Sequence, residues 1–160
     1  MIADLMNSRA VFNWGPLVAR VFLSALFIFA GVGKITGFAG TVGYIASVGL
    51  PAPSLLAVLT IIVEVGGGLM LLTGFMGRIA AKLLFGFTLL ATIFFHINFA
   101  DQMQTVMALK NLAIMGGLLM VFVHGTGPMS LRCLCAKCGN CGKCHYCEDG
   151  KCAANSQNHV

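Results

Sequence analysis

Four long apolar stretches, each with very few charged residues, constrain this 160-residue chain more than any other feature. Each is close to the ~20 residues that a helix needs to cross the ~30 Å hydrocarbon layer of a membrane. Apolar residues make up 58% of the chain and charged residues 9%, which leaves too little polar surface to coat a soluble globule. The sequence therefore predicts an all-α integral membrane protein, a four-helix bundle. The expected transmembrane helices cover approximately residues 16–33, 54–73, 78–97 and 105–124.

Proline and glycine mark the expected ends of these helices. Pro16 stands where proline is tolerated at a helix start, Pro51 and Pro53 precede the second stretch, and Gly74 and Gly77 separate the second from the third. We therefore expect three segments. They are an N-terminal segment at 1–15, a four-helix transmembrane domain at 16–128 and a cysteine-rich tail, short and irregular, at 129–160.

The basic residues predict the orientation in the membrane. Cytoplasmic loops of membrane proteins are enriched in Lys and Arg. Only Lys34 and Lys110 fall on one side, and eight basic residues fall at or near the other: Arg9, Arg20, Arg78, Lys82, Arg132, Lys137, Lys143 and Lys151. We therefore expect a multi-pass protein of the bacterial inner membrane with both termini in the cytoplasm. The net charge of +5 then reflects topology, and no nucleic-acid-binding module is present in the sequence.

Polar residues inside the expected helices follow helical stripes. On the first helix, Arg20, Ser24 and Lys34 share one face with Phe27 and Gly31 at 100° per residue. An ionisable group in hydrocarbon is expensive and normally faces the bundle interior. The corresponding stripes on the later helices are Thr60, Glu64, Gly67 and Gly68, then Thr88, Thr92 and His96, then Lys110 and Asn111.

These stripes predict one polar site within the membrane. Its candidate residues are Arg20, Lys34, Glu64, His96, Lys110 and Asn111. We expect Glu64 to pair with Lys110, because an unpaired carboxylate is costly at that depth. Two interpretations stay open: an ion pair that only fixes helix register, or a substrate or proton-relay site. Gly66, Gly67 and Gly68 are expected to allow close helix packing, and His96 to form a local hydrogen bond in preference to binding metal.

The same residues resemble the DoxX family of bacterial four-helix membrane proteins over about residues 16–128. The matching pieces are Arg20 with the run 29–35 and Phe38, then Glu64-Val65-Gly66-Gly67-Gly68-Leu69 with the run 71–74 and Arg78, and finally His96, Lys110-Asn111-Leu112 and Gly116-Gly117. The resemblance implies a redox-associated membrane protein, since some members are linked to quinone-coupled sulfur oxidation and others to thiol or oxidative-stress complexes. Some members are encoded beside small cysteine-rich proteins in copper or gold stress clusters.

The tail is the feature that an ordinary DoxX-like bundle lacks. It contains all seven cysteines, at Cys133, Cys135, Cys138, Cys141, Cys144, Cys147 and Cys152. Cysteines separated by two residues can bring both sulfurs to one ion, and overlapping pairs let several ions share thiolates. This spacing favours Cu(I) or Zn(II), with His145 either a further ligand or a bystander. Disulfides are the weaker interpretation, since the number is odd and cytosolic thiols stay reduced.

Other roles for the tail also stay open. An iron–sulfur cluster is an alternative, although the run lacks the x3 spacing and following proline of bacterial ferredoxins. Palmitoylation, redox sensing and incidental thiols without a specific role are further alternatives.

Two functions therefore compete. The favoured one is a membrane protein with a metallothionein-like tail for soft-metal (copper) handling or metal and redox stress defence. The alternative is a membrane oxidoreductase subunit that reacts with quinone or thiols, or a scaffold for a soluble redox enzyme. The expected partners are the lipid bilayer and a soluble redox or metal-binding protein. Hydrolytic nucleophile motifs, phosphate-binding loops and dinucleotide fingerprints are absent from the sequence.

Overall fold

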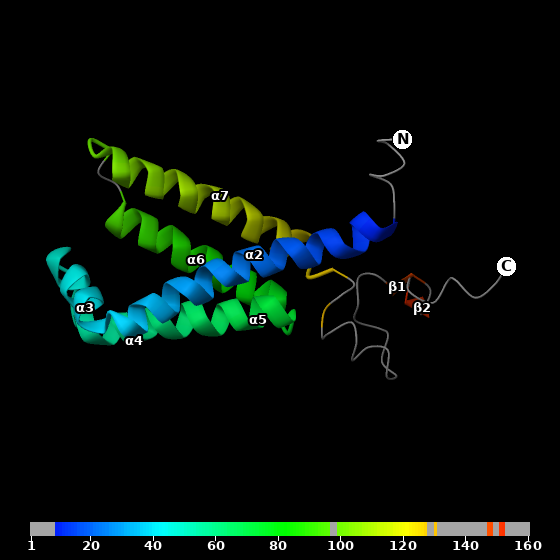
Figure 1. Cartoon of the computed structure of the whole chain (residues 1–160), viewed down its shortest axis with the longest axis horizontal. Helices are drawn as coiled ribbons and strands as arrows, with labels where there is room; N and C mark the ends of the chain where they lie inside the picture. Colours follow the sequence, from blue (N-terminus) through cyan, green and yellow to red (C-terminus); the bar gives the residue numbers. More distant parts are fainter. Residues whose placement is uncertain (1–8, 97–98, 128–129, 131–146, 149–150, 153–160) are drawn as a thin grey trace.

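A computed structural model of the chain describes residues 9–96, 99–127, 130, 147–148 and 151–152. It is an all-helical membrane bundle with one very short hairpin near the C-terminus (Figure 1). The helices are α2 (Arg9–Thr36), α3 (Phe38–Ser47), α4 (Pro53–Ile61), the π-helix η1 (Ile62–Gly66), α5 (Gly67–Thr73), α6 (Gly77–Phe95) and α7 (Gln102–His124). The strands are β1 (Cys147–Glu148) and β2 (Lys151–Cys152), paired antiparallel.

The prediction of four transmembrane helices is confirmed. Four helical stretches are long and apolar enough to cross a membrane, and α4, η1 and α5 together form the second. The four stretches are Trp14–Thr36, Pro53–Thr73, Gly77–Phe95 and Gln102–His124.

The helix ends differ from the expected ones in two places. α2 begins at Arg9, and Pro16 lies inside it and packs against Gly127. α7 begins one turn earlier than expected, because the Asp101 side chain accepts a hydrogen bond from the Met103 backbone N–H at 2.9 Å and caps the helix.

The short helix α3 was not expected from the sequence. Its 10 residues are too few to cross a membrane. It is connected to α4 through Gly49 and Ala52, which both adopt positive φ angles and so let the chain reverse direction. As a result, α3 packs against α4 at one end of the bundle (Figure 1).

The two ends of the bundle are packed differently. α5 packs closely against both α2 and α6, and α6 packs against α7 along its length. α4 continues the line of α5 but makes little contact with α6, so the two separate toward the end that carries α3 (Figure 1). The buried core accordingly lies in the closely packed part and includes Phe27, Leu71, Leu84 and Leu118.

Glycines allow this close packing at three helix crossings. A Cβ atom on Gly67 would lie 2.9 Å from Leu84, and one on Gly68 would lie 2.8 Å from Ile28. A Cβ atom on Gly31 would lie 2.6 Å from Val65 in η1. The expected packing role is therefore confirmed for Gly67 and Gly68, whereas a Cβ on Gly66 would meet open space.

The end opposite α3 is closed by the chain that follows α7. Gly74 ends α5 with φ of +71°, and both the Arg20 guanidinium and Ser130 lie against it. Arg20 and Ser130 are almost fully buried there, with exposed fractions of 1% and 3%. Gly77 packs in the same way against Thr126. The first residues after α7 are thus part of the bundle.

Most of the tail lies outside the described residues. Of the seven cysteines, the structure describes only the backbone of Cys147 and Cys152, which are opposite residues of the β1–β2 hairpin. Cys133, Cys135, Cys138, Cys141 and Cys144 fall in the part that is not described. The predicted metal site and the three-segment division therefore stay predictions.

We predict that Gly31→Ala lowers the thermal stability of the bundle in detergent, because the added methyl group would collide with Val65. Overpacking of this kind costs about 1–3 kcal/mol. Gly33→Ala is the matched control, since it lies on the same helix with nothing within 4 Å of a Cβ atom. Equal melting temperatures for the two variants would contradict the close crossing of α2 and η1.

Candidate functional site

The π-helix η1 places Glu64 in the interior of the bundle. π-helical turns are rare and often occur at functional sites. Glu64 lies near the middle of the second transmembrane stretch and is only 5% exposed. The Gly31 crossing brings α2 against the backbone of Val65 and the Cβ of Glu64. A side chain one turn further along the same face of α2 therefore points toward Glu64.

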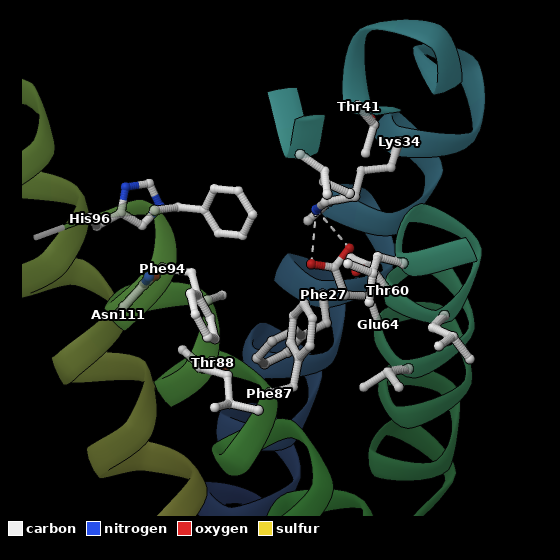
Figure 2. Close-up of a pocket in the computed structure, with 18 of the residues that line it drawn as sticks. Phe27, Lys34, Thr41, Thr60, Glu64, Phe87, Thr88, Phe94, His96 and Asn111 are labelled. Atoms are coloured by element: carbon white, nitrogen blue, oxygen red, sulfur yellow. Dashed lines mark hydrogen bonds and ion pairs between the residues drawn. The ribbon is translucent and has the colours of Figure 1, made fainter. Parts of the chain in front are cut away.

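That side chain is Lys34, and it forms an ion pair with Glu64. The Lys34 Nζ atom donates to both carboxylate oxygens of Glu64 at 2.8 Å (Figure 2). The Lys34 side chain is 30% exposed and the Glu64 side chain 6%, so the carboxylate is the more deeply buried partner. A bidentate pair of this kind satisfies a charge that would be very costly alone in the membrane.

The expected pairing of Glu64 with Lys110 is therefore wrong. Lys110 lies on α7, which packs against α6 and α2 and has no extensive contact with η1. The Lys110 Nζ atom instead donates to the Met107 Sδ atom at 3.1 Å, and the residue is exposed. The prediction failed because helix depth alone does not tell which helices are neighbours.

Polar side chains form a second group, held by hydrogen bonds between α6 and α7. The Asn111 Nδ2 atom donates to Thr92 Oγ1 at 2.9 Å, and Thr92 Oγ1 donates to the Thr88 carbonyl at 2.7 Å. Near the end of α6, His96 Nδ1 lies 2.7 Å from Gln104 Oε1. The local hydrogen bond expected for His96 is thus present, and its partner is on α7.

A cavity of about 520 Å³ separates the two polar groups. Its size is typical of a site for a small organic ligand. Figure 2 shows the Lys34–Glu64 pair on one side of it and His96 with Asn111 on the other. Between them lie mainly aromatic and aliphatic side chains, including Phe27, Phe87 and Phe94 (Figure 2).

Some of the residues that line the cavity lie on the outer surface of α4 and α6. Leu59 of α4 and Leu90 and Phe94 of α6 line it, and each is between 46% and 56% exposed on the outer surface of a transmembrane helix. These residues would face lipid in a membrane. A hydrophobic ligand could therefore enter from the bilayer without crossing water.

The structure brings five of the six candidate polar residues to this cavity. Lys34, Glu64, His96, Lys110 and Asn111 all line it. Arg20 does not; it lies about four turns from Lys34 on α2, or roughly 21 Å along the helix axis. Arg20 instead belongs to the closed end of the bundle, beside Gly74 and Ser130.

Sequence reasoning missed the contribution of α3 to the cavity. Thr41, Tyr44 and Ile45 of α3 line it, and the Tyr44 ring stacks on Phe95 of α6 with ring centroids 5.1 Å apart. This contact joins α3 to α6, and both rings line the cavity. The one feature of the sequence that could have drawn attention to α3 is Tyr44, the only tyrosine outside the tail.

Comparison with known proteins fits this architecture. The DoxX family profile matches residues 15–97. The chain is also 46% identical to the inner membrane protein YqjF of Escherichia coli (strain K12) over 117 residues, 73% of this chain and 88% of YqjF. This chain belongs to the DoxX family. No solved structure gives a significant match to it.

Two further relatives extend the comparison. The inner membrane protein YphA of Escherichia coli (strain K12) is 32% identical over 138 residues, which cover 79% of this chain and 98% of YphA. The Bacillus subtilis (strain 168) protein named "Putative oxidoreductase CatD" is 34% identical over 82 residues, 51% of this chain and 59% of CatD. The chain is thus a DoxX-family membrane protein with a more distant relative named as an oxidoreductase.

We predict that Lys34→Met and Glu64→Gln each destabilise the bundle, because each leaves a buried polar partner unpaired. Breaking a buried pair costs about 3–5 kcal/mol. The double variant should recover part of this loss, which a double-mutant cycle on unfolding in detergent measures. Lys110→Met is the matched control, and adding it should leave the coupling energy between Lys34 and Glu64 unchanged. Coupling of Glu64 to Lys110 in place of Lys34 would refute the assigned pair.

Proposed function

We propose that this protein is a membrane oxidoreductase component whose bundle binds a quinone-class ligand drawn from the lipid. The cavity is the observation that carries the proposal, because the Lys34–Glu64 pair lies across it from His96 and Asn111, with aromatic side chains between them and surface-exposed apolar residues in its wall. An ion pair that only fixed helix register would need no such cavity. The oxidoreductase name of the CatD relative supports the same class.

The residues around the cavity suit the chemistry of a quinone. Its reduction takes up two electrons and two protons and yields a hydroquinone. The Lys34 ammonium would polarise a ring oxygen, and Glu64 and His96 are groups able to exchange protons there. A pair of thiols would supply the electrons, since their oxidation to one disulfide releases two electrons and two protons.

The position of the cavity indicates from which side of the membrane the thiol reductant would approach. Ser130 lies at the Arg20 end of the bundle, so the cysteine-rich tail begins at the end opposite the cavity. With both termini in the cytoplasm, as the basic residues predict, the cavity would occupy the periplasmic half of the bilayer. The thiol donor is then a separate soluble redox partner on the α3 side, and the inner membrane is the proposed location, as for YqjF and YphA.

We expect the purified protein in lipid nanodiscs to bind a short-chain benzoquinone saturably. Lys34→Met should weaken binding by roughly tenfold, the effect of losing one charge-assisted hydrogen bond. Isothermal titration calorimetry measures this. Arg78→Met is the matched control, because it removes a cation at the other end of the bundle. Equal affinity in the wild type and the Lys34 variant would count against the site.

Soft-metal handling by the tail is a second candidate function. It rests on the spacing of the seven cysteines, which suits Cu(I) or Zn(II). This function and quinone binding are compatible, because the tail follows a residue, Ser130, that lies at the end of the bundle opposite the cavity.

Metal analysis of anaerobically purified protein tests the tail directly. We expect copper or zinc bound to the full chain and lost when all seven cysteines are replaced by serine. Replacement is preferable to truncation, since Ser130 is packed into the bundle. Iron with acid-labile sulfide would favour a cluster, and a metal-free tail would exclude metal handling.

A further inference from the structure

The two polar sides of the cavity differ in the kind of hydrogen bond that they offer a ligand. This difference decides which oxidation state of a quinone fits, so the inference rests on the proposed function. It follows from which donors and acceptors are already engaged within the bundle.

The Lys34–Glu64 side offers a donor. A lysine ammonium has three N–H groups and no acceptor. Two of these N–H groups donate to the two Glu64 carboxylate oxygens at 2.8 Å. The third is left for the cavity that Lys34 lines. Lys34 therefore favours a ligand atom that accepts, such as a carbonyl or phenolate oxygen.

The His96–Asn111 side offers acceptors. The Gln104 carbonyl oxygen can only accept, so this contact favours the His96 tautomer that carries its proton on Nδ1 and leaves Nε2 as the acceptor atom. The Asn111 amide nitrogen is engaged with Thr92 Oγ1, which leaves Asn111 Oδ1 as its acceptor atom. Within the part of the chain that the structure describes, neither His96 Nε2 nor Asn111 Oδ1 has a hydrogen-bond donor.

We infer that the cavity selects the reduced, hydroxyl-bearing form of its ligand, with one ring oxygen accepting from Lys34 and a hydroxyl at the other end donating to His96 or Asn111. A hydroquinone provides both groups. A quinone has two acceptor oxygens, so one of them would face the acceptors of the His96–Asn111 side without a donor. Two buried acceptor atoms that face each other share no proton, so neither regains the hydrogen bond that it made with water, and binding is weaker.

Titration calorimetry with three matched probes tests this inference in lipid nanodiscs under anaerobic conditions. The probes are a decyl-substituted 1,4-benzohydroquinone, the corresponding quinone and the dimethyl ether of the hydroquinone. We expect the hydroquinone to bind about tenfold more tightly than the quinone. The dimethyl ether should lose this advantage, because it keeps the ring and both oxygens but has no O–H group.

Variants of the two sides make the outcomes distinguishable. Asn111→Leu should reduce the preference for hydroquinone, whereas Lys34→Met should weaken both oxidation states. Lys34-dependent binding in which quinone equals or exceeds hydroquinone would overturn the inference and leave the proposed function intact. Binding of neither form would overturn both. The ether comparison uses the unaltered protein, so the test holds even if a variant fails to fold.

Discussion

The ion pair between Lys34 and Glu64 is the interaction on which the arrangement of the transmembrane bundle depends. A carboxylate in the middle of a transmembrane stretch requires a partner, and the 2.8 Å bidentate contact supplies one from a neighbouring helix. The pair forms because α2 crosses η1 at Gly31, where a larger side chain would collide with Val65. The absence of a side chain at Gly31 thus allows the two helices to approach closely, so that Lys34, one turn further along α2, reaches Glu64.

The rest of the bundle divides around this crossing. Toward Arg20, close packing through Gly67 and Gly68 and the burial of Ser130 give a closed end. Toward α3, where α4 makes little contact with α6, the bundle contains a cavity with polar groups on both sides and surface-exposed apolar side chains of α4 and α6 in its wall. The same four helices therefore form a closely packed end and an end that contains the cavity.

Much of this arrangement could be predicted from the sequence, and the reasons for the rest are physical. Hydrophobic length predicted the four membrane helices, and helical periodicity predicted that Glu64 and Lys34 face the interior. Periodicity says nothing of which helices are neighbours, so Glu64 was assigned to Lys110. The contribution of Tyr44 depends on packing between α3 and α6, segments far apart in the sequence, which local pattern does not encode. The metal ligands of the tail stay a prediction from cysteine spacing.

Solid-state NMR of the protein in lipid bilayers tests the central claim most directly. A nitrogen–carbon correlation experiment would detect a lysine Nζ atom close to the Glu64 carboxyl carbon. The structure predicts a cross-peak that is present in the wild type and in Lys110→Met and absent in Lys34→Met. A cross-peak that survives Lys34→Met, or no cross-peak in the wild type, would contradict the ion pair and the site built around it.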